Sequence, residues 1–160
     1  MKKLKILTPF LILLLITSSC GSTKVVRQSK RVIKGNWTLN QITYDKSDNF
    51  KISLFDDAAQ NCFEGSTWQF ISNNNSGTYT LKSTSCDQQL RYFKFTIIEV
   101  DKITGLHDFL LKPTNAKGKS ENNDKGYRLK LTQLSDTNMQ WQLSLFVEGS
   151  PFLINMNFIK

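Results

Sequence analysis

The stretch Met139–Val147, MQWQLSLFV, carries an apolar side chain at every second position, with mostly polar residues between them. Because successive side chains of an extended chain point to opposite sides, this spacing predicts a β-strand with one buried face. Residues 127–132 and 152–158 repeat the alternation. Polar turns at residues 135–138 and 148–151 separate the three segments, which predicts an antiparallel meander.

Five segments upstream are rich in β-branched and aromatic residues and short of helix formers. They cover residues 36–44, 67–70, 78–83, 91–100 and 106–112. The total of eight strands predicts an all-β domain. Residues 49–59 are interpreted as a short helix or a lid-like loop, and the polar residues 113–125 as an exposed loop.

Eight antiparallel strands laid flat would leave two exposed edges, and closing the sheet removes both. We therefore predict an eight-stranded up-and-down antiparallel barrel, whose interior is filled by side chains or holds one small ligand. A flattened sandwich is the main alternative. An outer-membrane barrel is a further one, but it needs strands of about 9 to 11 residues, and several segments here are shorter.

Residues 1–19 are typical of an export signal, with a basic start and an apolar run from Ile6 to Ile16. The run is shorter than the roughly 20 apolar residues of a transmembrane helix, which favours cleavage. Residues 13–20, LLLITSSC, resemble the lipobox of bacterial lipoproteins, although Thr17 stands where that family has Leu, Val or Ile. The resemblance implies that Cys20 is the lipidated first mature residue. Ordinary secretion with an unmodified Cys20 and an uncleaved signal anchor are the alternatives.

Lipidation of Cys20 would leave Cys62 and Cys86 as an even pair in a chain bound for an oxidising compartment. We predict a disulfide between them, which would stabilise the fold by about 3 kcal/mol. Two buried free thiols are the alternative. Since His107 is the single histidine and the two cysteines are distant in sequence, we expect no metal site, and the sequence indicates no other cofactor.

Signal removal takes away three of the 21 Lys and Arg and none of the 13 acids, which leaves a side-chain charge of +5. We assign residues 20–34 to a basic tether that lies against lipid head groups, where each cation contributes about 1 kcal/mol. Its cations are Lys24, Arg27, Lys30, Arg31 and Lys34. No nucleic-acid partner is expected, because no basic stripe interleaved with aromatic residues follows the tether.

Gly35-Asn36-Trp37 matches the Gly-x-Trp motif that opens the first strand of lipocalins, in which the tryptophan packs at the closed end of the barrel. With seven further strands and the cysteine pair, residues 33–160 resemble the lipocalin-like domains of bacterial lipoproteins, especially those of Bacteroidetes-type organisms. The resemblance implies a barrel domain over residues 35–160, with Gly35 and Trp37 at its base. Larger lipocalins also have a Thr-Asp-Tyr turn, an arginine covering the tryptophan, and a C-terminal helix, none of which this sequence shows.

The resemblance implies a non-catalytic lipoprotein that binds a small hydrophobic ligand and is anchored in the outer membrane, facing the periplasm. The side chains expected to line the interior are apolar or aromatic, as a site for an acyl chain would be. They are Phe70, Tyr79, Phe93, Phe95, Trp141, Leu143, Ile154 and Met156. The same residues could simply fill the barrel, which would then serve as a scaffold for a protein partner in the cell envelope.

Two pairs of neighbouring residues carry side chains that could serve catalysis. His107 and Asp108 are neighbours, but adjacent residues of a strand face opposite sides. Asp56 and Asp57 lie in a polar segment and are interpreted as a helix start or a solvated turn. We therefore expect no catalytic residues.

Overall fold

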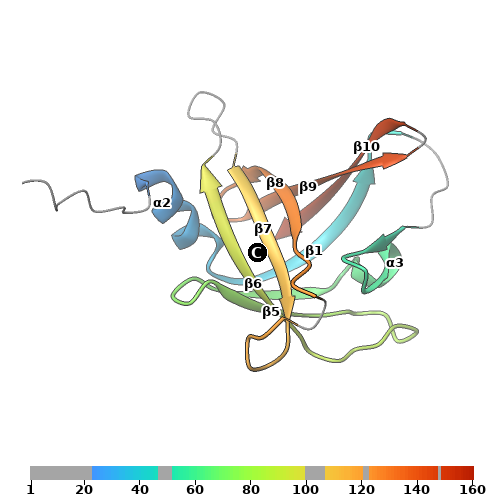
Figure 1. Cartoon of the computed structure of the whole chain (residues 1–160), viewed down its shortest axis with the longest axis horizontal. Coiled ribbons are helices and arrows are strands. Elements are labelled where there is room, and N and C mark those ends of the chain that lie inside the picture. The colour runs from blue at the N-terminus through green and yellow to red at the C-terminus, as the bar shows by residue number, and fades with distance from the viewer. Residues whose placement is uncertain (1–22, 47–51, 100–106, 121–122, 148) are drawn as a thin grey trace, which may run out of the picture.

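The computed structural model describes residues 23–46, 52–99, 107–120, 123–147 and 149–160. Eight strands in it close into one antiparallel barrel with the order β1-β10-β9-β8-β7-β6-β5-β4 (Figure 1). Each barrel strand therefore pairs with the barrel strands before and after it in the chain, and β10 pairs with β1 to close the wall. The signal peptide predicted over residues 1–19 and the modification predicted at Cys20 lie outside the described residues.

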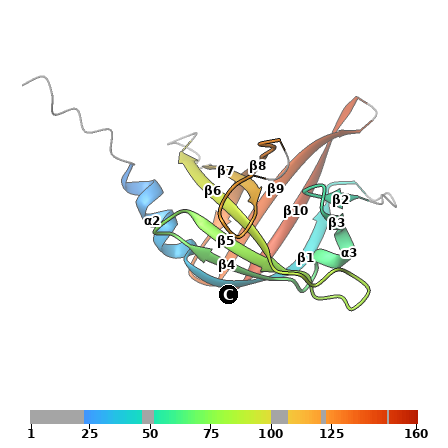
Figure 2. The same cartoon turned by 60° about the horizontal axis from the view of Figure 1, so that its bottom comes forward.

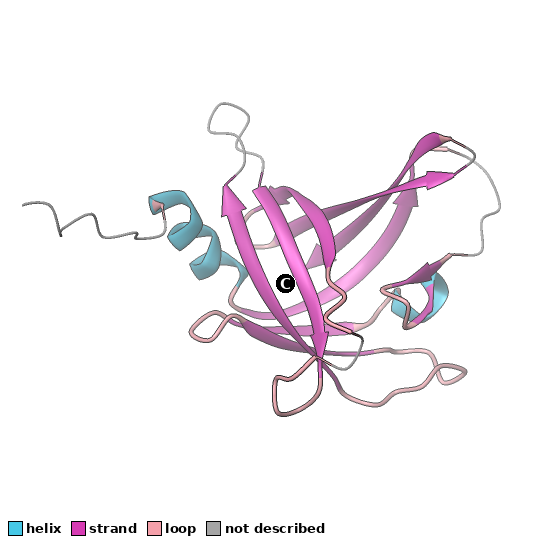
Figure 3. Ribbon diagram, in the orientation of Figure 1, coloured by secondary structure: helices cyan, strands magenta, loops and turns pink. Residues whose placement is uncertain are grey.

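The prediction of an eight-stranded up-and-down barrel is confirmed, and the sandwich is excluded because β1 pairs with both β10 and β4. Figure 3 shows the strands wrapping around one interior. The barrel strands are β1 (Gly35–Tyr44), β4 (Thr67–Ile71), β5 (Ser76–Thr80), β6 (Arg91–Glu99), β7 (His107–Thr114), β8 (Tyr127–Leu134), β9 (Asn138–Val147) and β10 (Ser150–Ile159).

Several strand boundaries differ from those predicted. Strand β5 begins at Ser76, two residues before the predicted segment 78–83, because residues 76–79 pair with β6. Strand β7 continues into the predicted polar loop, since Thr114 is buried and pairs with Tyr92. The turn predicted over residues 148–151 is shorter, because Ser150 and Pro151 already pair with the end of β9.

One end of the barrel is covered by helix α2 (Lys24–Ile33), which lies within the segment assigned to the tether and was not predicted. The Thr23 hydroxyl accepts a hydrogen bond from the amide of Val26 and so caps the first turn. Val26 and Ile33 are buried against the barrel, while the basic side chains Lys24 and Arg31 stay exposed. The helix packs against β6 and β8, so ordered structure begins well before residue 35.

The same end holds the tryptophan of the Gly-x-Trp motif. The Trp37 indole donates a hydrogen bond of 2.7 Å to the carbonyl of Ile33, which ties β1 to α2. No arginine follows the last strand, but Lys160 takes the place that the lipocalin resemblance gives to one. Its ammonium lies 5.0 Å from the centre of the Trp37 ring and donates a hydrogen bond to the carbonyl of Val32.

Gly77 on β5 allows an unusually close approach inside the barrel. A β-carbon at this position would come closer than 3.0 Å both to the Phe93 ring and to the backbone carbonyl oxygen of Gln69. The backbone oxygen cannot move without disturbing the pairing of β4 with β5. The ring of Phe93 therefore occupies space that only glycine leaves free.

We expect Gly77→Ala to lower the free energy of unfolding by about 2 kcal/mol, the typical cost of overpacking a core. Urea denaturation measures the loss. Gly126→Ala is the matched control, because a β-carbon there would lie 3.5 Å from the Leu111 oxygen, an ordinary contact. Equal stability of the two variants would contradict the prediction.

Candidate functional site

The barrel interior is apolar throughout its described length. All eight side chains expected to line it are buried: Phe70, Tyr79, Phe93, Phe95, Trp141, Leu143, Ile154 and Met156. Alternation along the strands places them inside, while polar side chains such as Lys130 and Gln142 face outward. Their role in ligand binding stays a prediction.

Aromatic rings fill the middle of the barrel. The Trp68 ring lies within 6.4 Å of seven other aromatic rings, from β4, β5, β6, β9, β10 and the segment between β1 and β4. Its indole N–H donates to the hydroxyl of the buried Ser66. Trp141 stacks on Phe109 with ring centres 4.6 Å apart. Room for a ligand must therefore come from the ends of the barrel rather than from its middle.

The end opposite α2 is covered by residues 52–63 (Figure 2), which we call the lid. The lid consists of the two-stranded hairpin β2 (Ser53–Leu54) and β3 (Ala58–Ala59), followed by the short helix α3 (Gln60–Phe63). The lid-like loop expected over residues 49–59 is thus a hairpin in its described part. Three apolar side chains of the lid are buried: Leu54, Phe55 and Phe63.

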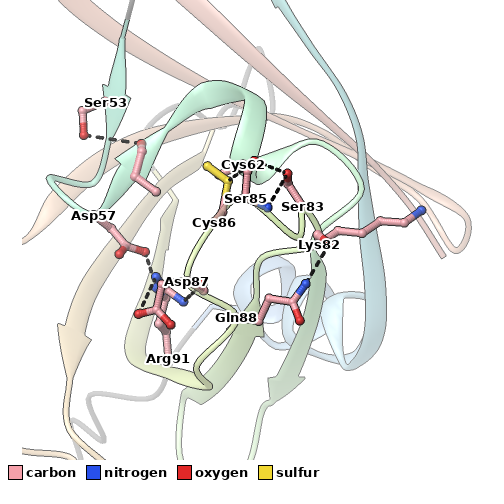
Figure 4. Close-up of a disulfide and its surroundings, with 11 residues drawn as sticks. Ser53, Asp57, Cys62, Lys82, Ser83, Ser85, Cys86, Asp87, Gln88 and Arg91 are labelled. Carbon is pink, nitrogen blue, oxygen red and sulfur yellow. Dashed lines mark hydrogen bonds and ion pairs between the residues drawn. A yellow bond between two sulfur atoms is a disulfide. The ribbon is translucent and has the colours of Figure 1, made fainter.

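A disulfide fastens the helical end of the lid to the barrel. Cys62 of α3 is bonded to Cys86 in the loop between β5 and β6 (Figure 4), which is the pairing predicted from the number of cysteines. Tyr44 at the end of β1 also donates a hydrogen bond to Gln60. Helix α3 is therefore held on two sides, whereas the hairpin has no covalent link to the barrel wall beyond the chain itself.

Charged side chains hold the hairpin tip to the rim of the barrel. The Asp57 carboxylate lies 2.5 Å from the Arg91 guanidinium (Figure 4). It also accepts a hydrogen bond of 2.7 Å from the Tyr79 hydroxyl. Asp56 is paired with Lys125 from the loop before β8, and this hydrogen bond lowers the pKa of the Asp56 carboxyl. Both lid carboxylates thus meet cations of the barrel rim.

A cleft of about 400 Å³ opens beside the hairpin tip at this rim. Phe55 and Asp57 line one side, and Arg91, at the start of β6, and Pro113, at the end of β7, line the other. Its lining combines polar side chains, such as Asp56, with the aromatic residues Phe55 and Tyr79.

Two tyrosine hydroxyls at the lid end of the barrel, which we call the mouth, have raised pKa values. Burial, together with donation to the Asp57 carboxylate, raises the pKa of Tyr79 far above its usual value near 10. Burial and the nearby Asp56 raise the pKa of Tyr127 to about 12. The folded protein therefore keeps protons that the unfolded chain releases above pH 10.

Because the folded state then binds more protons than the unfolded state, the free energy of unfolding should fall as the pH rises above about 10. Tyr79→Phe removes the larger of these contributions, so we expect a clearly shallower fall between pH 9 and 11 than in the wild type. Urea denaturation across this range measures the slope. A measurement at pH 7 controls for the hydrogen bond lost with the hydroxyl, and an unchanged slope would refute the role of Tyr79.

The structure separates the members of one of the two pairs that could serve catalysis and places the other pair in the lid. Asp108 forms an ion pair with Arg128 on the outer wall, while His107 lies on the opposite face of β7, near α2 and β8. Asp56 and Asp57 lie in the hairpin turn rather than at a helix start. Within the described ranges, no group of three His, Cys, Asp or Glu side chains could hold a metal ion.

These features define a small up-and-down β-barrel protein with an apolar interior and a pinned lid. Among solved structures, a lipocalin-like protein from Bacteroides uniformis ATCC 8492 is similar, with a TM-score of 0.46 and 12% sequence identity. The match covers 81% of this chain and 98% of that chain. No family model matches the chain, and no curated protein matches it in sequence. No helix in the described part is long and apolar enough to cross a membrane.

Proposed function

We propose that this protein is a non-catalytic lipoprotein of the cell envelope whose barrel binds a small hydrophobic ligand. The observation that carries the proposal is the covered mouth: an apolar interior is closed at one end by α2 and, at the other, by a lid with a cleft beside it. Concave, mostly apolar sites with a few polar groups are the usual form of small-ligand sites.

The ligand test is native mass spectrometry of the protein purified from membranes, followed by quenching of its tryptophan fluorescence with fatty acids. Trp68 lies next to the lid residue Phe55, so a ligand entering at the mouth should change its emission. We expect a co-purified apolar molecule or saturable quenching. Absence of both would overturn the binding function.

The proposed anchor is a lipidated Cys20 in the outer membrane, facing the periplasm. The exposed cations Lys24, Arg27 and Arg31 support it, because they follow at helical spacings of three and four and so share one side of α2. Metabolic labelling with an alkyne fatty acid should mark the wild type and Ser22→Ala, and Cys20→Ser should lose the label. A labelled Cys20→Ser protein would refute the anchor.

A second candidate is a protein-interaction scaffold, favoured by an exposed aromatic residue. Phe146 near the tip of the β9–β10 hairpin is 79% exposed, and its cross-strand partner Pro151 is exposed as well. A photo-reactive amino acid at position 146 should cross-link a partner in intact cells if this surface docks one. The same probe at the exposed Thr96 on β6 is the control.

A further inference from the structure

The lid turn contains a residue that the turn itself does not favour. Phe55 and Asp56 have φ angles of 56° and 53°, and the amide of Asp57 donates to the carbonyl of Leu54 across the turn. A tight turn with two positive φ angles prefers Asn and Gly, and a bulky aromatic residue in this region is a true outlier. The local backbone therefore does not explain Phe55.

The barrel interior does explain it. The Phe55 side chain is 3% exposed, and its ring meets Phe63, Trp68 and Tyr127 edge to face, with centres 5.2 to 6.3 Å apart. Trp68 and Tyr127 belong to barrel strands, so the ring sits in an aromatic slot at the mouth. The hairpin thus buries the Phe55 ring, next to the buried Leu54, at the expense of an unfavourable turn.

The two residues after Phe55 place negative charge on the rim. Asp56 meets Lys125, and Asp57 meets Arg91 and the Tyr79 hydroxyl. Together, Phe55, Asp56 and Asp57 present an apolar group in the slot and carboxylates on two cations. An amphiphile with a carboxylate head and an apolar tail carries the same two kinds of group.

We propose that the hairpin, residues 52–59, is a displaceable plug that imitates the ligand, and that the ligand is an amphiphile with a carboxylate head and an apolar tail. Its tail replaces the Phe55 ring among Phe63, Trp68 and Tyr127. Its head replaces the Asp57 carboxylate on Arg91, which also pairs with Asp87, and the Asp56 carboxylate on Lys125. This inference rests on the proposed function and names the ligand class of the same site.

The structure also indicates which part of the lid moves. The hairpin pairs only Ser53 with Ala59 and Leu54 with Ala58, and a two-stranded hairpin alone is marginally stable. Helix α3 stays in place because the disulfide holds Cys62. Phe63 therefore remains as one wall of the slot when Phe55 leaves.

The test is calorimetric titration of the full chain, in nanodiscs of neutral lipid, with octanoate and with 1-octanol. We expect octanoate to bind more tightly than 1-octanol at pH 7.5, and Phe55→Ala to bind octanoate about tenfold more tightly, because no ring must be displaced. Arg91→Gln should reduce the preference for the acid, because Lys125 is then the one cation left of the two that bind the head. The controls are Phe146→Ala for the aromatic residue and Lys130→Gln for the cation, because both side chains are exposed and neither lines the cleft.

A second measurement uses the wild type alone, in case Phe55→Ala does not fold. Hydrogen exchange at the amides of Asp57 and Gln60, which bond to the carbonyls of Leu54 and Ile52, should become faster when octanoate saturates the protein. Slower or unchanged exchange would overturn the proposal that the hairpin is a displaceable plug. Equal affinity for octanoate and 1-octanol, with no gain in affinity from Phe55→Ala, would also overturn this proposal, but it would leave the proposed ligand binding intact. If neither compound binds to the wild type or to Phe55→Ala, the proposed function itself is wrong.

Discussion

Trp68→Ala is expected to lower the free energy of unfolding by about 4 kcal/mol, more than any other single substitution proposed for this protein. The side chain is 1% exposed and lies against seven aromatic rings, so its removal leaves a cavity that rigid neighbours cannot collapse to fill. It also leaves the buried Ser66 hydroxyl without its indole donor. Urea denaturation, followed by far-UV circular dichroism, measures the loss.

Two variants make the result specific. Trp68→Phe keeps a ring in the core but not the hydrogen bond to Ser66, so it should fall between the wild type and Trp68→Ala. Phe146→Ala removes an aromatic side chain that is 79% exposed and should change stability by less than about 0.5 kcal/mol. A loss below about 2 kcal/mol for Trp68→Ala would mean that the barrel is not packed around this residue.

Removing the Cys62–Cys86 disulfide in a double alanine variant is expected to cost about 3 kcal/mol. The bond closes a loop with a sequence separation of 24 residues, and opening it restores conformational freedom mainly to the unfolded chain. A reducing agent should lower the stability of the wild type by the same amount and leave the double variant unchanged. This comparison separates loss of the bond from loss of the cysteine side chains.

The disulfide also decides how much of the lid can open. With the bond in place, α3 and Phe63 remain on the barrel while the hairpin moves. Without it, the whole of residues 52–63 can separate, and Phe63 leaves the slot together with Phe55. We therefore expect the double variant to bind both octanoate and 1-octanol more weakly, because the slot for the apolar tail loses a wall. Unchanged affinities for both compounds would show that Phe63 contributes nothing to the site.

The barrel could be predicted from the sequence because its strands alternate strictly. Segments such as Met139–Val147 have one apolar face, and eight such faces close most simply around a common interior. Alternation also identified the inward side of each strand, so all eight expected interior residues are buried. The boundaries were less exact at Ser76 and Thr114, where pairing with a neighbouring strand extends the strand into polar sequence.

Helix α2 was missed because its cations suggested a solvated tether. The signal was present in the apolar residues: Val25 and Val26 are repeated seven residues later as Val32 and Ile33, which places an apolar pair on one side of a helix every two turns. Thr23 stands where a helix cap would be expected. The basic side chains favoured a solvated tether, although the spacing of the apolar side chains indicated a helix.

The contacts of the lid could not be predicted from the sequence. Phe55 sits next to two aspartates, and the local sequence around Asp56 and Asp57 indicates a solvated turn. Lys125 lies 69 residues away from Asp56 in the chain, and Tyr79 lies 22 residues from Asp57. Only closure of the barrel brings these groups to one rim, so the pairing depends on tertiary structure.

Under the proposed anchoring at Cys20, the placement of α2 and the lid at opposite ends of the barrel would decide where a ligand is exchanged. Cys20 precedes the first helical residue by four positions, a span of roughly 14 Å at full extension. A protein anchored there would rest with α2 on its own bilayer and hold the mouth about 30 Å above it, at the far end of strands of up to ten residues. Cargo would then be exchanged with whatever arrives across the aqueous space, such as a soluble carrier or the facing membrane, rather than drawn from the leaflet that holds the anchor.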